Sequence, residues 1–205
     1  ESSPHPNPLP HAGEGAQPDS DMTFSPAGPI LETERLLLRV QQAGDFERYA
    51  EMLAHPSSLH IGGPLLRHVA WRRFLQMPGA WVLQGFAMFS VVEKSSGRWM
   101  GQAGPWCPDG WPGTEVGYSF HMDARGKGYA TEACAAAMDY AFDTLGWDEV
   151  IHSISPENTA SQTVAQRLGS RNRGPGKLPP PLDVHAIEIW AQPRAEWAEN
   201  RKRFA

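Results

Sequence analysis

The sequence predicts an α/β (α+β) fold, in which about four helices flank a mixed, mostly antiparallel and twisted sheet of six to seven strands. Val116, Tyr118 and Phe120 alternate with more polar residues, the period-2 pattern of a half-buried strand. Apolar residues then recur at helical spacing from Ala130 to Leu145, before Gly146. The predicted elements do not alternate strand and helix throughout, as they would in a doubly wound nucleotide-binding fold.

The predicted elements follow one another in a simple order. Residues 36–40 form a strand, and residues 43–54 and 67–77 form helices, the first of which begins near Asp45. Three strands follow at 86–92, 99–104 and 114–121, and a polar turn at 93–98 joins the first two. The remaining elements are a helix at 128–145, a strand at 149–155, a helix at 158–168 capped by Asn158, and a closing strand at 184–190. Residues 171–183 are rich in glycine and proline, which predicts a stiff loop outside the sheet ladder.

Composition divides the 205-residue chain into a tail and one domain. Residues 1–29 are rich in proline and lack periodic apolar residues, so we expect them to be disordered. This tail is either a solvated segment or a partner-binding polyproline segment around residues 5–11. Residues 30–205 have enough length for a single packed domain.

Charge, cysteine content and hydropathy exclude several classes of protein. The net charge is -5, and the first thirty residues carry four acidic and no basic residues, so the rest is nearly balanced. Such balance argues against nucleic-acid binding. Cys107 and Cys134 cannot form a disulfide framework, and a buried free thiol at Cys134 suits a reducing cytoplasm. We find no run of ~18 apolar residues for a membrane span, and no histidine–cysteine spacing typical of a metal site.

The most informative segment is the turn Arg125–Ala130, between the strand at 114–121 and the following helix. A glycine-containing turn at a helix start directs unpaired N–H groups outward, where the helix dipole favours an anion. Gly126 and Gly128 also let a phosphate approach the backbone closely. The alternative is an ordinary strand-to-helix turn. Neither the P-loop nor the dinucleotide-binding glycine pattern fits, because Thr131 stands where the latter needs a third glycine or alanine.

The pattern that fits is [QR]-x-x-G-x-[GA], present as Arg125-x-x-Gly128-x-Ala130. It resembles the acetyl-CoA pyrophosphate loop of the GNAT N-acetyltransferase superfamily. Residues 158–161 (Asn-Thr-Ala-Ser), followed by Leu-Gly at 168–169, resemble the family's second cofactor segment. Residues 34–39 (Glu-Arg-Leu-Leu-Leu-Arg) resemble the opening strand of the branch that includes ribosomal-protein N-terminal (RimJ/RimL-like) acetyltransferases. The resemblance spans residues 30–193 and implies the GNAT fold.

The resemblance implies that acetyl-CoA binds as co-substrate between the strands at 114–121 and 149–155, which part from each other. The implied binding residues are Val116, Tyr118 and Phe120 of the first strand, Arg125, Gly126, Lys127, Gly128, Tyr129, Ala130 and Thr131 of the turn, and Asn158 and Ser161 of the second segment. Arg125 and Lys127 would add positive charge there. In the family, the region that matches residues 171–183 helps to shape the acceptor pocket. Here it either does so or is a plain connector.

Glu115 is the candidate general base, because a carboxylate can attract an ammonium group and accept its proton. It shares a face of the strand with Gly117, where the missing side chain is expected to leave space. The alternative is a structural carboxylate, and His121 and Asp123 are weaker candidates.

Many members of the superfamily carry a proton-donating tyrosine seven residues after the asparagine of the second segment. Ala165 occupies that position here, so Ser161 is the candidate acid, or else only binds the cofactor. The tryptophans of the loop at 106–112 either wall an acceptor pocket or form a satellite core.

We therefore predict a cytoplasmic acetyltransferase, monomeric or homodimeric, that acts on a primary amine and binds neither nucleic acid nor membrane. A protein or peptide N-terminus is the first expected acceptor, and a small amine is the second. Two alternatives stay open: a non-catalytic acyl-CoA-binding or sensor protein of the same fold, and a nucleotide-binding protein.

Overall fold

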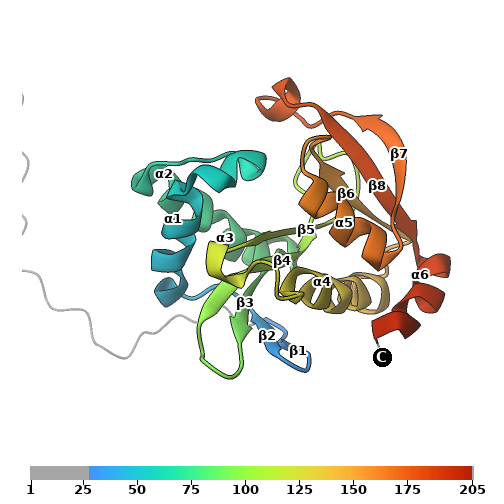
Figure 1. The fold of residues 1–205 in the computed structure, drawn as a ribbon, viewed down its shortest axis with the longest axis horizontal. Coiled ribbons are helices and arrows are strands. Elements are labelled where there is room, and N and C mark those ends of the chain that lie inside the picture. Colours follow the sequence, from blue (N-terminus) through green and yellow to red (C-terminus); the bar gives the residue numbers. More distant parts are fainter. Residues whose placement is uncertain (1–27, 205) are drawn as a thin grey trace, which may run out of the picture.

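A computed structural model describes residues 28–204 of the chain, built around one twisted eight-stranded sheet (Figure 1). The strands are β1 (Leu31–Glu32), β2 (Leu36–Arg39), β3 (Phe89–Glu93), β4 (Trp99–Trp106), β5 (Glu115–Phe120), β6 (Glu149–Ile154), β7 (Arg171–Gly176) and β8 (Ile187–Pro193). Their order in the sheet is β1-β2-β3-β4-β5-β6-β8-β7. Neighbouring strands run antiparallel except β5 and β6, which run parallel.

Six α-helices accompany the sheet in residues 28–204: α1 (Phe46–Ala54), α2 (Arg67–Phe74), α3 (Gln76–Gln84), α4 (Tyr129–Asp139), α5 (Thr159–Leu168) and α6 (Arg194–Asn200). In Figure 1, α1 and α2 lie on one side of the molecule, whereas α4 and α5 lie against the central strands. The predicted mixed, mostly antiparallel fold is confirmed. The sheet has one strand more than the upper limit predicted, and there are two more helices.

The expectation that residues 171–183 lie outside the ladder was wrong for their first half. Residues Arg171–Gly176 form β7, which pairs antiparallel with β8. The register shifts between Asn172 and Pro175, where Gly174 has a φ of 98°. Because β7 is an edge strand and contains this irregularity, the missing N–H group of Pro175 does not interrupt an interior ladder.

Several predicted boundaries moved. The helix expected at 67–77 is two helices, and α3 continues to Gln84 because Pro78 lies in its first turn, where an N–H group would have no partner in the helix. The strand expected at 86–92 begins at Phe89, and the closing strand is shifted to Ile187–Pro193. The long helix expected at 128–145 is α4 followed by a π-helical turn at Tyr140–Thr144. Neither β1 nor α6 was predicted.

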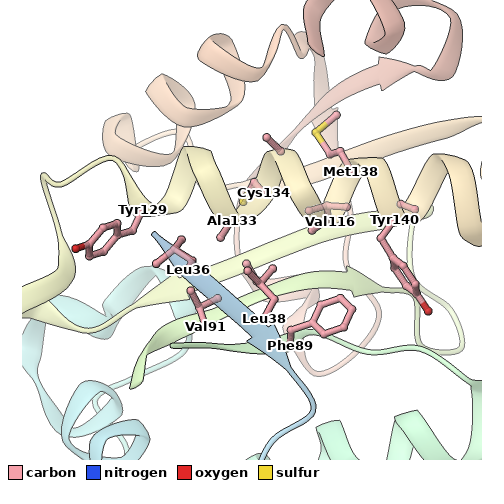
Figure 2. Packing of buried hydrophobic residues seen from close by; sticks show 14 of the residues in the cluster. Leu36, Leu38, Phe89, Val91, Val116, Tyr129, Ala133, Cys134, Met138 and Tyr140 are labelled. Atoms are coloured by element: carbon pink, nitrogen blue, oxygen red, sulfur yellow. The ribbon is translucent and has the colours of Figure 1, made fainter. Parts of the chain in front are cut away.

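The main core lies between α4 and strands β2 to β5. Figure 2 shows Ala133 of α4 facing side chains of these strands, among them Leu36 and Leu38, and Cys134 and Met138 belong to the same cluster. The Cys134 side chain is fully buried, as predicted, and burial raises the pKa of its thiol. A second cluster joins α1, α2 and β4 through Phe46, Tyr49, Ala50, Met52, Leu53, Ala70, Phe74 and Trp99.

The predicted tail, residues 1–29, lies outside the described residues except for Gly28 and Pro29. In the described range, no helix is both long enough and apolar enough to cross a membrane.

Candidate active site

The sheet opens between its two parallel strands. Within residues 28–204, β5 and β6 share one register pair, Glu115 with Ile151. The amide of Ile151 donates to the Thr114 carbonyl at 2.9 Å, after which the strands diverge. The predicted parting of these two strands is therefore present in the structure, and it begins at Glu115.

The pairing with β4 determines which backbone groups of β5 face this opening. The amide of His121 donates to the Met100 carbonyl at 2.9 Å. In an antiparallel ladder such bonded positions alternate, so residues 115, 117 and 119 also direct their backbone groups toward β4. Val116, Tyr118 and Phe120 consequently direct theirs toward β6. Two of their carbonyl oxygens have partners: Val116 O accepts from the His152 ring at 2.8 Å, and Phe120 O accepts from Arg125 Nε at 3.3 Å.

The turn that leads from β5 to α4 has the features of an anion site. Gly126 and Gly128 have φ angles of 74° and 81°, in the left-handed region that disfavours other residues. A Cβ atom on Gly126 would meet no atom within 4 Å, so the turn is open on that side. No side chain caps the first turn of α4, so its N–H groups remain available to a ligand. Ala130 and Thr131 lie in this first turn.

Arg35 is a residue at this turn that the sequence did not single out. Its guanidinium donates to the Lys127 carbonyl at 2.9 Å and to Glu132 Oε2 at 2.7 Å, and it lies 4.7 Å from the centre of the Tyr129 ring. Glu132 also accepts from Thr33 and from the Arg35 amide, which ties the turn to the start of β2. The sequence feature that could have indicated a cation here is Glu132, an acidic residue in the first turn of the helix.

The side chain of Arg125 makes a different contact from the one expected. Its Nη1 atom donates to Ser57 Oγ at 2.7 Å, in addition to the bond that Nε makes to Phe120 O. The cation with a hydrogen bond to the turn's backbone is therefore Arg35. The Tyr129 side chain also has a partner within the protein, because its hydroxyl donates to Glu93.

The second predicted segment lies at the start of α5. Asn158 caps this helix, as predicted, because its Oδ1 atom accepts from the Ser161 amide at 3.1 Å. The hydroxyl of Tyr118 donates to the Ser161 carbonyl at 3.1 Å, which joins β5 to α5 across the opening. Ala165, one turn further along, is fully buried against Ile154 and Trp190, among the side chains of a third core cluster.

Glu115 lies where β5 and β6 begin to part, and it is only 8% exposed. Burial raises the pKa of its carboxyl from 4.5 to about 7. The Trp111 indole donates to Glu115 Oε2 at 2.7 Å. This hydrogen bond and those from Ser153 of β6 lower the pKa and so offset part of the increase caused by burial. The carboxyl therefore changes its protonation state near neutral pH.

The surroundings of Glu115 answer two of the questions left by the sequence. Trp111 contacts Trp106 edge to face and holds the carboxylate, so the 106–112 loop supports Glu115. The space beside Gly117 is not empty as expected, because a Cβ atom there would collide with the Met88 side chain. The Met88 side chain thus lies on the same face of β5 as the Glu115 carboxyl.

The weaker candidates, His121 and Asp123, belong to an ion-pair network. Burial works against ionisation of Asp123, but hydrogen bonds from Arg48 and His121 outweigh it and lower its pKa to about 2. Arg98 also contacts this carboxylate at 2.7 Å. Asp123 stays ionised near neutral pH, which suits a structural ion pair better than proton exchange. Among residues 28–204, no group of three or more potential ligands is placed to hold a metal ion.

Comparison with known proteins gives matches over most of the described chain. The family model described as an acetyltransferase (GNAT) domain matches residues 35–171. A Bacillus licheniformis protein named Uncharacterized N-acetyltransferase p20 is 29% identical over 148 residues, which cover 70% of this chain and 83% of that protein. The crystal structure of the acetyltransferase from Agrobacterium tumefaciens str. C58 is 30% identical, with a TM-score of 0.71, and the alignment covers 85% of this chain and 98% of that one.

A third match concerns the fold alone, since its identity is 20%. The ribosomal-protein-S5-alanine acetyltransferase from Vibrio fischeri has a TM-score of 0.64, and the alignment covers 82% of this chain and 98% of that one.

Proposed function

This chain belongs to the GNAT acetyltransferase family, and we propose that it transfers the acetyl group of acetyl-CoA to the α-amino group of a protein or peptide. The observation that carries the proposal is Glu115, a buried carboxyl with a pKa of about 7 at the point where β5 and β6 part. A small primary amine is the second candidate acceptor.

The residues of the site fit acetyl-CoA. The uncapped start of α4 and the open side of Gly126 suit a pyrophosphate. The backbone groups of Tyr118 and the amide of Phe120 face the β5–β6 opening, where they can pair with an extended arm as a strand would. The Val116 carbonyl is already bonded to His152 and the Phe120 carbonyl to Arg125. Bound there, acetyl-CoA supplies an acyl thioester, whose carbonyl is open to attack by an amine.

Glu115 is proposed as the general base, acting directly or through a water. An α-amino group titrates at about 8, so most of it is protonated at neutral pH and must lose a proton before it attacks. Trp111 holds the Glu115 carboxylate by one oxygen, Oε2. We propose that Oε1 receives the proton, because Trp111 bonds only to Oε2.

Ser161 is proposed to assist the leaving thiol. Its amide is held by Asn158 and its carbonyl by Tyr118, so the first turn of α5 keeps a fixed position at the edge of the opening. A thiol titrates near 8.5, so its thiolate is a modest base that a hydroxyl or an ordered water is able to protonate. The cytoplasmic setting and the oligomeric state stay predictions.

The acceptor is proposed from the opening-strand resemblance and the Vibrio fischeri neighbour, which is named for a ribosomal-protein alanine. The test is release of free CoA thiol from acetyl-CoA with three acceptors. They are a peptide with a free N-terminal alanine, the same peptide with a blocked N-terminus and one lysine, and a panel of small amines. The proposal expects turnover with the first. Acetyl-CoA binding without turnover on any acceptor would favour the non-catalytic sensor.

A further inference from the structure

His152 of β6 occupies the end of the β5–β6 opening. Its side chain is 1% exposed, although histidine is a polar residue and the sequence pattern did not single it out. The ring Nδ1 atom lies 2.8 Å from the Val116 carbonyl, and Nε2 lies 3.1 Å from Ser170 Oγ. The ring therefore reaches from β6 to β5, one residue beyond the last backbone pair.

The chemistry of these contacts fixes the proton on one nitrogen. A carbonyl oxygen only accepts, so Nδ1 must carry hydrogen and donate to Val116. Burial lowers the pKa of His152 to about 4, so the ring is neutral near pH 7 and Nε2 accepts from the Ser170 hydroxyl. Both ring nitrogens are thus satisfied in a single tautomer.

The Val116 carbonyl is the acceptor that continued strand pairing would use. The Ile151 amide donates to Thr114 O, and in a parallel ladder the next amide facing β5, that of Ser153, would donate to Val116 O. Instead, the strands are too far apart there for a backbone bond, and the longer His152 side chain donates to this oxygen. The buried carbonyl remains satisfied while the strands stay apart.

We propose that His152 is a positioning residue that holds β5 and β6 apart and so keeps Tyr118 and Phe120 available to the acyl donor. The inference rests on the proposed function, since the opening is taken to receive acetyl-CoA. Without the ring donor, Val116 O would have no partner until β5 moved toward Ser153. That movement would narrow the opening beside Tyr118.

Two amide variants separate the positioning role from plain burial. His152→Asn places an amide near the former Nδ1, where it still donates to Val116 O. His152→Gln places its amide near the former Nε2, toward Ser170. Both remove the ring, so we expect similar losses in melting temperature. Acetyl-CoA affinity, measured by calorimetry, should stay within about threefold of wild type for His152→Asn and weaken at least tenfold for His152→Gln.

Ser170→Ala is the matched control, because it removes the other hydrogen bond of the ring but leaves Nδ1 in place. Its acetyl-CoA affinity should equal that of the wild type. If His152→Gln does not fold, His152→Ala replaces it as the variant without a donor. Equal affinity in the Asn and donor-less variants would overturn the proposal.

Hydrogen exchange without ligand tests the same idea independently of acetyl-CoA. In the wild type, the amide of Tyr118 should exchange quickly because it faces the opening. In His152→Gln this amide should become protected as the strands pair, whereas in His152→Asn it should not. Unchanged exchange in His152→Gln would refute the positioning role. Failure of the wild type to bind acetyl-CoA, with the exchange pattern as expected, would refute only the proposed function.

Discussion

Replacing Glu115 by glutamine should make the protein more stable at alkaline pH while removing its activity. Glutamine keeps the size and the hydrogen bond from Trp111 but cannot ionise. The carboxyl is buried and its pKa is raised from 4.5 to about 7. Since a tenfold change in an equilibrium is worth about 1.4 kcal/mol, ionising this group in the folded protein costs about 3 kcal/mol relative to the unfolded chain.

The sign follows from proton linkage. Below pH 4.5, Glu115 is protonated in both the folded and the unfolded state, and no penalty exists. Between pH 4.5 and about 7, the unfolded chain ionises more readily, so wild-type stability falls as pH rises. Above about 7 the full penalty applies. Other titrating groups are shared by both proteins, so their contribution cancels in the comparison.

Urea unfolding of wild type and Glu115→Gln at pH 5 and pH 8 measures this effect directly. The stability advantage of the variant should grow by about 2–3 kcal/mol between the two values, which for a domain of this size shifts the melting temperature by roughly 5–10 °C. An advantage that is the same at both pH values, or that grows toward acid, would refute the assigned pKa. The catalytic rate should fall about 10²-fold or more, with acetyl-CoA affinity unchanged.

Four further predictions concern the cofactor segments. Gly128→Val should weaken acetyl-CoA binding at least tenfold, whereas Gly97→Val, also at a positive φ but in the β3–β4 turn, should not; calorimetry compares the two. Arg35→Ala should also weaken binding, and Arg35→Lys should not restore it, because lysine lacks the forked contact with Lys127 O and Glu132. Ser161→Ala should slow turnover several-fold at unchanged affinity, and a loss of affinity at full turnover would mean that Ser161 only anchors the cofactor. Ala165→Tyr should destabilise the protein by about 1–3 kcal/mol in urea unfolding without raising the rate, because Ala165 is fully buried.

The sequence predicted the features that depend on local patterns. The alternation in β5, the helical period of α4 and the asparagine cap of α5 are each encoded within a few residues, and all are present. Prediction from the sequence failed where contacts between residues far apart in the chain determine the structure. β7 contains Gly174 and Pro175, which discourage a strand, yet β8 supplies a partner at the sheet edge. Arg35 is 97 residues from Glu132, so its place at the turn depends on how β2 packs beside α4.

The pKa of Glu115 also sets the cost of deprotonating the proposed acceptor amine. A base with a pKa of about 7 takes a proton from an α-amino group, which titrates near 8, at a cost of about 1 kcal/mol. The same transfer from a lysine side chain, which titrates near 10.4, costs about 5 kcal/mol. A glutamate with an ordinary pKa would pay several kcal/mol more for either acceptor. Burial of Glu115 thus lowers the cost of proton transfer by the same amount for both amines, and an N-terminus is the easier acceptor only because its own pKa is lower.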